Sequence, residues 1–272
     1  AMPSNVAQFG DENPVKAWYS SLPPVTRIWW TLAFMFANLV YFGVLDVTYL
    51  IWDFGMVTKK FQLWRVVTSF CFVGTWGQSG FGTLISLYLL QQYGKSLENN
   101  APNTGGGGTV ADYMVLITFC MLIHILITIF FAPRFIMGSS LMFTTLYIWC
   151  KMNYETEVKL WGFPMKAAVF PFALMGLHLA TGNDVWSDVY GLAVGHCYYF
   201  LQEVYPTMYG KDIIHTPNFV ISLCHRLKIG GGYVNPNANS TAPRGVPPPG
   251  RVRPPTGGGY NWGGGGRTLG SS

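Results

Sequence analysis

Side chains able to carry out chemistry are sparse in this chain, and few are spaced for a shared site. The sequence has five cysteines, an odd number, and they form no CxxC pair or other metal-binding spacing. Four of them lie in or beside apolar segments, so we expect small core residues rather than a disulfide framework; the five are Cys71, Cys120, Cys150, Cys197 and Cys224. We expect no metal site and no cofactor.

His124 is the only ionisable group in the apolar run from 113 to 131. No second ionisable residue lies near it in the sequence, which argues against a metal ligand or a proton carrier. We expect a neutral imidazole that is hydrogen-bonded to a neighbouring helix.

Two glycines, Gly191 and Gly195, lie four residues apart in the apolar segment 188–206. Residues at this spacing share one face of a helix, and two glycines there open a groove for a second helix. The pair predicts a seam of close helix packing.

The composition is that of a membrane protein. Of the 272 residues, 50% are hydrophobic and only 11% are charged, less than half the charge of an ordinary soluble domain. The net charge of +5 does not indicate a nucleic-acid partner, because seven of the 17 Lys and Arg follow Pro206, where only Asp212 opposes them. We interpret residues 207–272 as a cytosolic juxtamembrane segment and a tail that is disordered beyond 230.

The apolar runs predict an all-α membrane bundle of six transmembrane helices within residues 28–206. The longest runs are long enough to cross the hydrocarbon layer of a bilayer, and the short fourth run is acceptable in the core of a bundle. We expect the first span to act as the targeting signal, since residues 1–27 contain no signal-peptide core. The predicted spans are 29–49, with Trp29 and Trp30 at the interface, 81–93, 113–131, 135–149, 167–180 and 188–206.

Three connecting segments also carry predictions. Residues 13–26 place Val15, Trp18, Tyr19 and Leu22 on one face, the pattern of a short helix in the membrane interface. The stretch 50–80 contains three cations that would be costly inside a bilayer, which favours a structured loop half sunk in lipid. The glycine-rich linker 105–108 predicts a flexible connection without a site.

Orientation follows from the basic residues. If the six spans alternate, thirteen Lys and Arg fall on one side and four on the other, which predicts cytosolic N- and C-termini.

Several motifs resemble the rhomboid superfamily. The segment around Gly191 and Gly195, followed by His196, is similar to the sixth helix of rhomboid proteases, which carry the catalytic histidine three residues before the first glycine. That position is Asp188 here. Trp64 and Arg65 resemble the Trp-Arg hallmark of the first rhomboid loop.

The segment Gly138-Ser139-Ser140-Leu141 is similar to the Gly-x-Ser-Gly motif that holds the rhomboid nucleophile. Ser140 occupies the nucleophile position, but Leu141 replaces the final glycine. With Asp188 in place of the histidine, the resemblance indicates a pseudoprotease with vestigial positions at Ser140 and Asp188 and no catalytic residue.

Within that superfamily the chain resembles the derlins. Leu97-Glu98, the later Ala111-Asp112 pair and the tail match derlin patterns. The tail resembles the motif by which derlins bind the AAA+ segregase called valosin-containing protein, at Trp262, Gly264, Gly266, Arg267 and Leu269 within 262–270. The resemblance implies a non-catalytic component of endoplasmic-reticulum-associated degradation with misfolded client proteins, membrane-embedded ubiquitin ligases and further copies or derlins as partners.

Alternatives remain open at this point. An intramembrane serine protease using Ser140 would need a base near neutrality. Asp188 has an ordinary pKa of about 4, and His196 lies about 12 Å further along the helix. A derlin-like import component of a plastid-surrounding membrane and an unrelated six-span transporter are further candidates. Trp64 and Arg65 could also serve only as membrane anchors.

Overall fold

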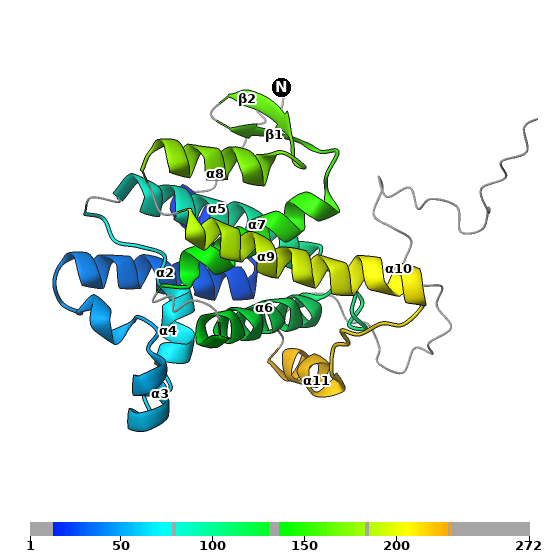
Figure 1. The fold of residues 1–272 in the computed structure, drawn as a ribbon, viewed down its shortest axis with the longest axis horizontal. Coiled ribbons are helices and arrows are strands. Elements are labelled where there is room, and N and C mark those ends of the chain that lie inside the picture. The colour runs from blue at the N-terminus through cyan, green and yellow to red at the C-terminus, as the bar shows by residue number, and fades with distance from the viewer. Residues whose placement is uncertain are drawn as a thin grey trace, which may run out of the picture. The chain divides into compact units, whose positions relative to one another are not determined.

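The computed structural model describes residues 13–77, 80–130, 136–160, 162–182, 185–227 and 229, and these residues are mostly helical (Figure 1). Among them, α6 (Val110–Phe130) alone is long and apolar enough to cross a membrane by length and composition. The shorter α8 (Phe170–Ala180) is also apolar. A helical bundle is therefore established, while the number of spans stays a prediction.

The N-terminal region forms α1 (Pro14–Ser20) and α2 (Pro24–Tyr41). The Asn13 side chain caps α1 by accepting a hydrogen bond from the Val15 amide, 3.0 Å away. α2 begins and ends earlier than the predicted range 29–49. Trp29 is only 7% exposed and donates its indole N–H to the Phe70 carbonyl at 3.0 Å. The prediction that Trp29 is an interface residue is therefore wrong, because its ring supports the following loop.

The segment after α2 is a structured loop, as its cations predict. It contains the short turn η1 (Val47–Tyr49), α3 (Phe54–Lys60) and α4 (Arg65–Cys71). α4 packs against both α2 and α7, so the loop is tied to the helical body rather than held only by lipid.

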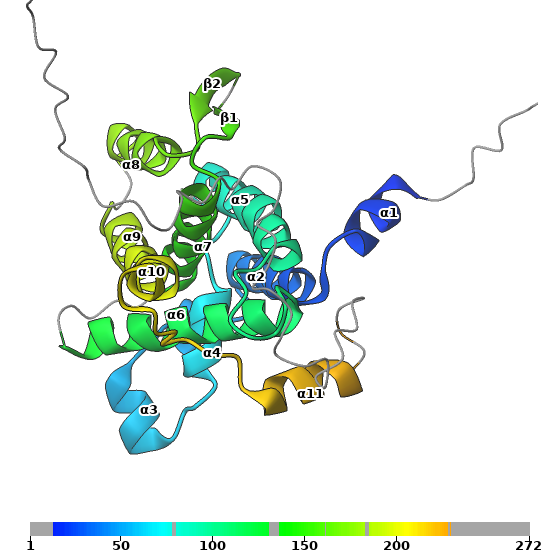
Figure 2. The same ribbon diagram turned by 90° about the vertical axis from the view of Figure 1, so that its right-hand side faces the viewer.

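The centre of the bundle is α7 (Gly138–Met152), most of whose side chains are buried. It packs against α5 (Gly80–Asn99) on one side and α9 (Trp186–Tyr199) on the other (Figure 2). α6 contacts α7 and α9 as well. This central placement brings the first turn of α7 between α6 and α9.

The polar connection after α7 contains a β-hairpin that the sequence did not predict. β1 (Glu157–Leu160) and β2 (Phe163–Lys166) pair antiparallel, with Glu157 opposite Lys166. The hairpin leads into α8, which packs on α7.

The last long helix continues beyond α9. A π-helical turn (Phe200–Val204) joins it to α10 (Tyr205–Tyr209), which ends at Gly210 in the left-handed conformation. Pro206 has no amide to donate, and a widened turn is a common adjustment near such a break. α11 (Asn218–Arg226) then packs on α6. The tail motif 262–270 lies outside the described residues.

Candidate functional site in the bundle and its loops

The two glycines of α9 lie directly against α7. A Cβ atom at Gly191 would come within 2.6 Å of the Ser140 carbonyl oxygen and 2.9 Å of the Phe143 Cβ. One at Gly195 would lie 2.8 Å from the Tyr147 ring. Because real Cβ atoms do not approach so closely, only glycine allows these two helices to cross at this distance.

Asp188 is buried on α9 and does not meet Ser140. Its carboxylate lies 2.6 Å from Nδ1 of His178 on α8. Neither Ser187 nor Asp188, the two residues whose types suit a helix cap here, occupies the cap position of α9, which is Val185 and makes no side-chain hydrogen bond. His196 is occupied as well, with Nδ1 3.0 Å from the Tyr147 hydroxyl.

Ser140 instead meets a base that sequence reasoning did not connect with it. The Oγ atom of Ser140 lies 2.9 Å from Nε2 of His124 on α6. Nδ1 of the same ring lies 2.8 Å from the Cys120 carbonyl oxygen, which can only accept. Nδ1 therefore carries the proton, and Nε2 accepts from the Ser140 hydroxyl. His124 does bind a neighbouring helix, but the expectation that Ser140 has no base within reach is wrong.

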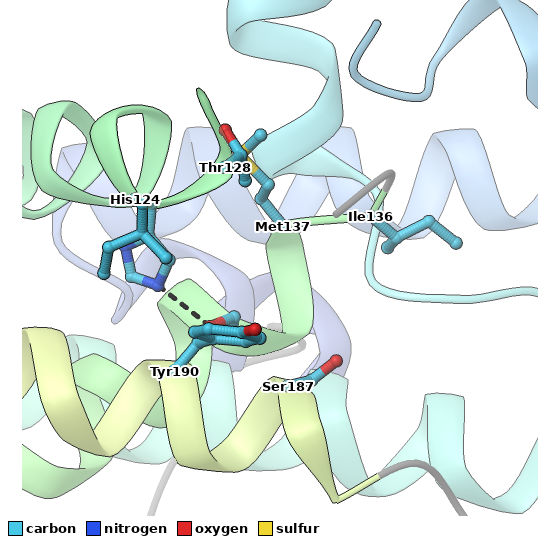
Figure 3. A pocket seen from close by; sticks show the side chains of 8 residues that line it. His124, Thr128, Ile136, Met137, Ser187 and Tyr190 are labelled. Atoms are coloured by element: carbon cyan, nitrogen blue, oxygen red, sulfur yellow. Dashed lines mark hydrogen bonds between the residues drawn. The ribbon is translucent and has the colours of Figure 1, made fainter. Parts of the chain in front are cut away.

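A small cavity lies beside this serine and histidine pair. Its volume is about 10 Å³, room for about one water molecule, and it is lined by His124, Thr128, Ile136, Ser140, Ser187 and Tyr190 among others. Figure 3 shows His124 projecting from α6, with Tyr190 and Ser187 contributed by α9; the dashed line is the hydrogen bond of His124 to Ser140. Tyr190 and Ser187 are half-buried, so the cavity lies near the surface of the bundle.

A larger, apolar cavity of about 230 Å³ lies between α5, β1 and α8. Its walls include Tyr88, Phe170 and Leu177, and Lys159 is its one charged lining residue. A cavity of this size at the side of a bundle can receive a few apolar side chains.

The Trp64 and Arg65 pair divides into an exposed and a buried member. Trp64 is 52% exposed, whereas Arg65 is 5% exposed. The Arg65 guanidinium donates to the carbonyls of Thr48 and Ile51, the latter at 2.9 Å, and to Gln62 Oε1 at 2.6 Å. Arg65 therefore holds the loop together, and the reading in which its charge extends to lipid headgroups is wrong.

Asp112 organises the glycine-rich linker. Its carboxylate accepts hydrogen bonds from the Gly106 and Gly108 amides, at 2.9 and 2.7 Å, and from the Thr104 and Thr216 hydroxyls. The Thr216 amide also donates to the Thr104 carbonyl, 2.8 Å away. The linker is thus ordered by hydrogen bonds, contrary to the flexible connection that its composition predicts, and it holds the segment that precedes α11.

Glu98 has a comparable role at the N-terminal end of α2. Its carboxylate accepts from the amides of Val25 and Thr26, at 2.9 and 2.7 Å, and from the Thr26 hydroxyl. These are first-turn amides of α2 that lack helical partners, and a carboxylate there is favoured by the helix dipole. The two acids of the derlin-like patterns are both structural.

No spacing in the sequence links His124 to Ser140. The two residues are sixteen positions apart on different helices, α6 and α7, and their hydrogen bond depends on how these helices cross. Among the described residues, no group of three or more His, Cys, Asp or Glu is placed to hold a metal ion. All five cysteines are free thiols, and four of them are buried.

Comparison with known proteins identifies the family. A family model described as the Der1-like family matches residues 22–218. The chain is 30% identical to Derlin-1.1 of Zea mays over 236 residues, which is 84% of this chain and 93% of the relative. It is 31% identical to Derlin-1 of Caenorhabditis elegans over 211 residues (76% and 81%) and 30% identical to a probable derlin-1 homolog of Dictyostelium discoideum over 252 residues (92% and 96%). The chain is therefore a membrane protein that belongs to the Der1-like, or derlin, family.

Proposed function

We propose that this derlin is a non-proteolytic component of endoplasmic-reticulum-associated degradation, which assists the movement of misfolded proteins to the cytosol. The observation that carries the proposal is the Der1-like match over residues 22–218, which includes every helix from α2 to α10. In this proposal the chain crosses the endoplasmic reticulum membrane six times and keeps both termini in the cytosol.

The short α8 supports a role in easing polar segments through the membrane. Its 11 residues extend for about 16 Å, roughly half the thickness of a hydrocarbon core. A span so short favours local thinning of the bilayer. Thinning lowers the free-energy cost of moving polar groups across.

The lateral cavity between α5 and α8 supports a route for client segments. Its apolar walls suit a hydrophobic stretch of polypeptide. Lys159, in strand β1 of the hairpin, lies on the cytosolic side in the proposed topology.

In this proposal the tail connects the protein to an ATPase, which supplies the energy for moving clients. We assign residues 262–270 to recruitment of the valosin-containing AAA+ ATPase, and membrane-embedded ubiquitin ligases and other derlin copies are the remaining proposed partners. Trp262 and Leu269 are the apolar anchors of this assignment.

The small size of the cavity beside Ser140, rather than the lack of a base, argues against an intramembrane protease. The cavity beside Ser140 has room for about one water molecule, which does not admit an extended peptide strand. Location in a plastid-surrounding membrane remains the alternative to be tested by imaging.

Site-specific photocrosslinking tests the proposal. A crosslinker at Leu177, which lines the lateral cavity, should capture a misfolded endoplasmic reticulum client in cells. The matched control is Leu126 on α6, an exposed apolar residue that does not line it. Equal capture at both positions, or none, would contradict the proposed route, and localisation to another membrane would contradict the proposed process.

A further inference from the structure

The lateral cavity of about 230 Å³ is elongated along two helices. α5 and α8 both pack on α7, and the cavity lies between them. Its α5 wall includes Ile85 and Leu89, four residues apart, and its α8 wall is formed by Phe170, Leu174 and Leu177. Residues at these spacings lie on one face of a helix, and the α8 set extends for about 10 Å along it. The cavity is therefore a narrow apolar space that runs parallel to the helices.

The lateral cavity reaches the surface of the bundle. Among its lining residues, Tyr88 on α5 is 61% exposed and Leu177 on α8 is half-buried. An apolar space gives water few hydrogen-bond partners, and an empty space deprives the residues around it of dispersion contacts. Because the surface of a membrane-spanning bundle is surrounded by lipid, a flexible hydrocarbon chain is the group most available to fill this cavity.

The charge at the lateral cavity is positive. Lys159 lines it from strand β1, and no acidic side chain is found among its described lining residues. The proposed topology places this strand on the cytosolic side, where the leaflet carries anionic lipids. A lysine can lay its methylene stem along an apolar wall while its ammonium group reaches a phosphate. The cavity therefore joins apolar walls to a partner for an anionic headgroup.

We propose that the lateral cavity holds one acyl chain of an anionic glycerophospholipid from the cytosolic leaflet, with the headgroup paired to Lys159. The volume is below the range of about 300–1,000 Å³ for pockets that enclose a whole small molecule, which limits the occupant to a single chain. The inference rests on the proposed function for its topology, and it adds a resting occupant to the proposed client route. A client segment that enters the cavity must displace this lipid chain.

Photolabelling of the purified full chain in phosphatidylcholine liposomes tests the proposal. The probe is a phosphatidylserine with a photoactivatable group in one acyl chain, and mass spectrometry maps its adducts. They should concentrate on residues 85–93 and 170–177, and an excess of unlabelled phosphatidylserine should suppress them more than phosphatidylcholine does. Leu177→Trp, which fills the cavity, should reduce these adducts about tenfold.

A second pair of variants tests the role of the charge. Lys159→Ala should lower labelling by the phosphatidylserine probe about fivefold, the effect of one lysine beside an anionic lipid surface. Labelling by the same probe with a phosphatidylcholine headgroup should stay unchanged. Lys166→Ala is the matched control, because Lys166 lies on the second strand of the same hairpin and does not line the cavity. It should label like the wild type.

Melting temperatures of all variants separate a lost lipid site from lost folding. Adducts spread evenly over the lipid-facing helices, or undiminished in a folded Leu177→Trp chain, would overturn the proposal. Equal labelling by the two headgroups, or no change in Lys159→Ala, would also refute it, because the contact would then be that of any lipid with any helix. The liposomes contain no client, so a failure here leaves the client crosslinking at Leu177 as an independent test of the proposed function.

Discussion

The hydroxyl of Thr144 on α7 donates a hydrogen bond to the carbonyl of Gly191 on α9, 3.0 Å away. The Ser140 carbonyl one turn earlier in α7 lies 2.9 Å from the same hydroxyl, so its single proton is shared between the two carbonyls. A side chain can bridge the two backbones in this way only because a glycine lets them come so close. The crossing of α7 and α9 is therefore fixed both by the close approach at the glycine and by this hydrogen bond.

Substitution of Gly191 should reveal how tightly this crossing is packed. Gly191→Leu should destabilise the protein by about 1–3 kcal/mol, since the side chain would meet the Ser140 carbonyl and Phe143. The measurement is a thermal melt in detergent. Gly176→Ala on α8, where a Cβ meets nothing within 4 Å, is the control and should melt at or above the wild-type temperature. A similar fall in both variants would show that the close approach is not the cause.

Substitutions of Arg65 and Trp64 should differ in their effect on stability, because Arg65 is buried and Trp64 is exposed. Arg65→Ala leaves the Thr48 and Ile51 carbonyls without their charged donor and should cost about 2 kcal/mol or more. The variant should also become sensitive to protease between residues 44 and 64. Trp64→Ala, at a 52% exposed position, should leave the melting temperature nearly unchanged and impair client degradation. Equal loss of melting temperature in the two variants would assign Trp64 a structural role instead.

Removing the Thr216 hydroxyl should make the segment that follows α10 open more often to solvent. Thr216→Val removes a donor to the buried Asp112 carboxylate and should raise hydrogen exchange over residues 211–227 while the rest of the helical body stays protected. Thr207→Val on α10 loses only a local bond to the Glu203 carbonyl at an exposed site and should exchange like the wild type. Unchanged exchange in Thr216→Val would mean that the Thr216 amide bond to the Thr104 carbonyl and the packing of α11 on α6 hold the segment without the hydroxyl.

The tail motif should bind the N-terminal domain of the valosin-containing ATPase as an extended strand. A peptide of residues 256–272 should bind with about micromolar affinity, because a short free peptide loses conformational entropy on docking. Trp262→Ala or Leu269→Ala should weaken binding about thirtyfold, the effect of losing a central anchor of about 2 kcal/mol. Tyr260→Ala, outside the motif, should change little. Calorimetry that detects no heat, or no loss in the anchor variants, would refute the assignment.

The sequon at Asn239 reports the orientation of the C-terminus. Asn239-Ser240-Thr241 is the one N-glycosylation sequon in the sequence and falls in the proposed cytosolic tail. We expect it to stay unmodified in cells. A mass shift that endoglycosidase removes, and that Asn239→Gln abolishes, would place the tail in the lumen.

Helix positions in this protein are predictable because apolar runs and breakers act locally. The structured loop after α2 also follows from its cations, since charges at Lys59, Lys60 and Arg65 cannot be left in hydrocarbon. What escapes local reasoning is the partner of each polar group. Trp29 is a good interface residue by type, and only the three-dimensional position of the Phe70 carbonyl makes it a buried donor.

The candidate site illustrates the same limit more strongly. A motif comparison directs attention to Asp188 as the partner of Ser140, because the comparison assumes that the base comes from α9. In the structure Asp188 is engaged by His178 on α8, and the imidazole that meets Ser140 comes from α6. The pairing depends on the rotation of α6 about its own axis, which the nearly uniform apolar sequence of that helix does not specify.

The attachment of Thr216 to Asp112 has a mechanical consequence. A pull on the chain beyond α11 would act first on the contact between α11 and α6, and then on the hydrogen bonds that join Thr216 to Thr104 and Asp112. Only after these yield would tension reach α10 and the glycine crossing behind it. The first turn of α6 therefore carries a force applied to the tail. Helices α7 and α9 bear none of it until the hydrogen bonds of Thr216 break.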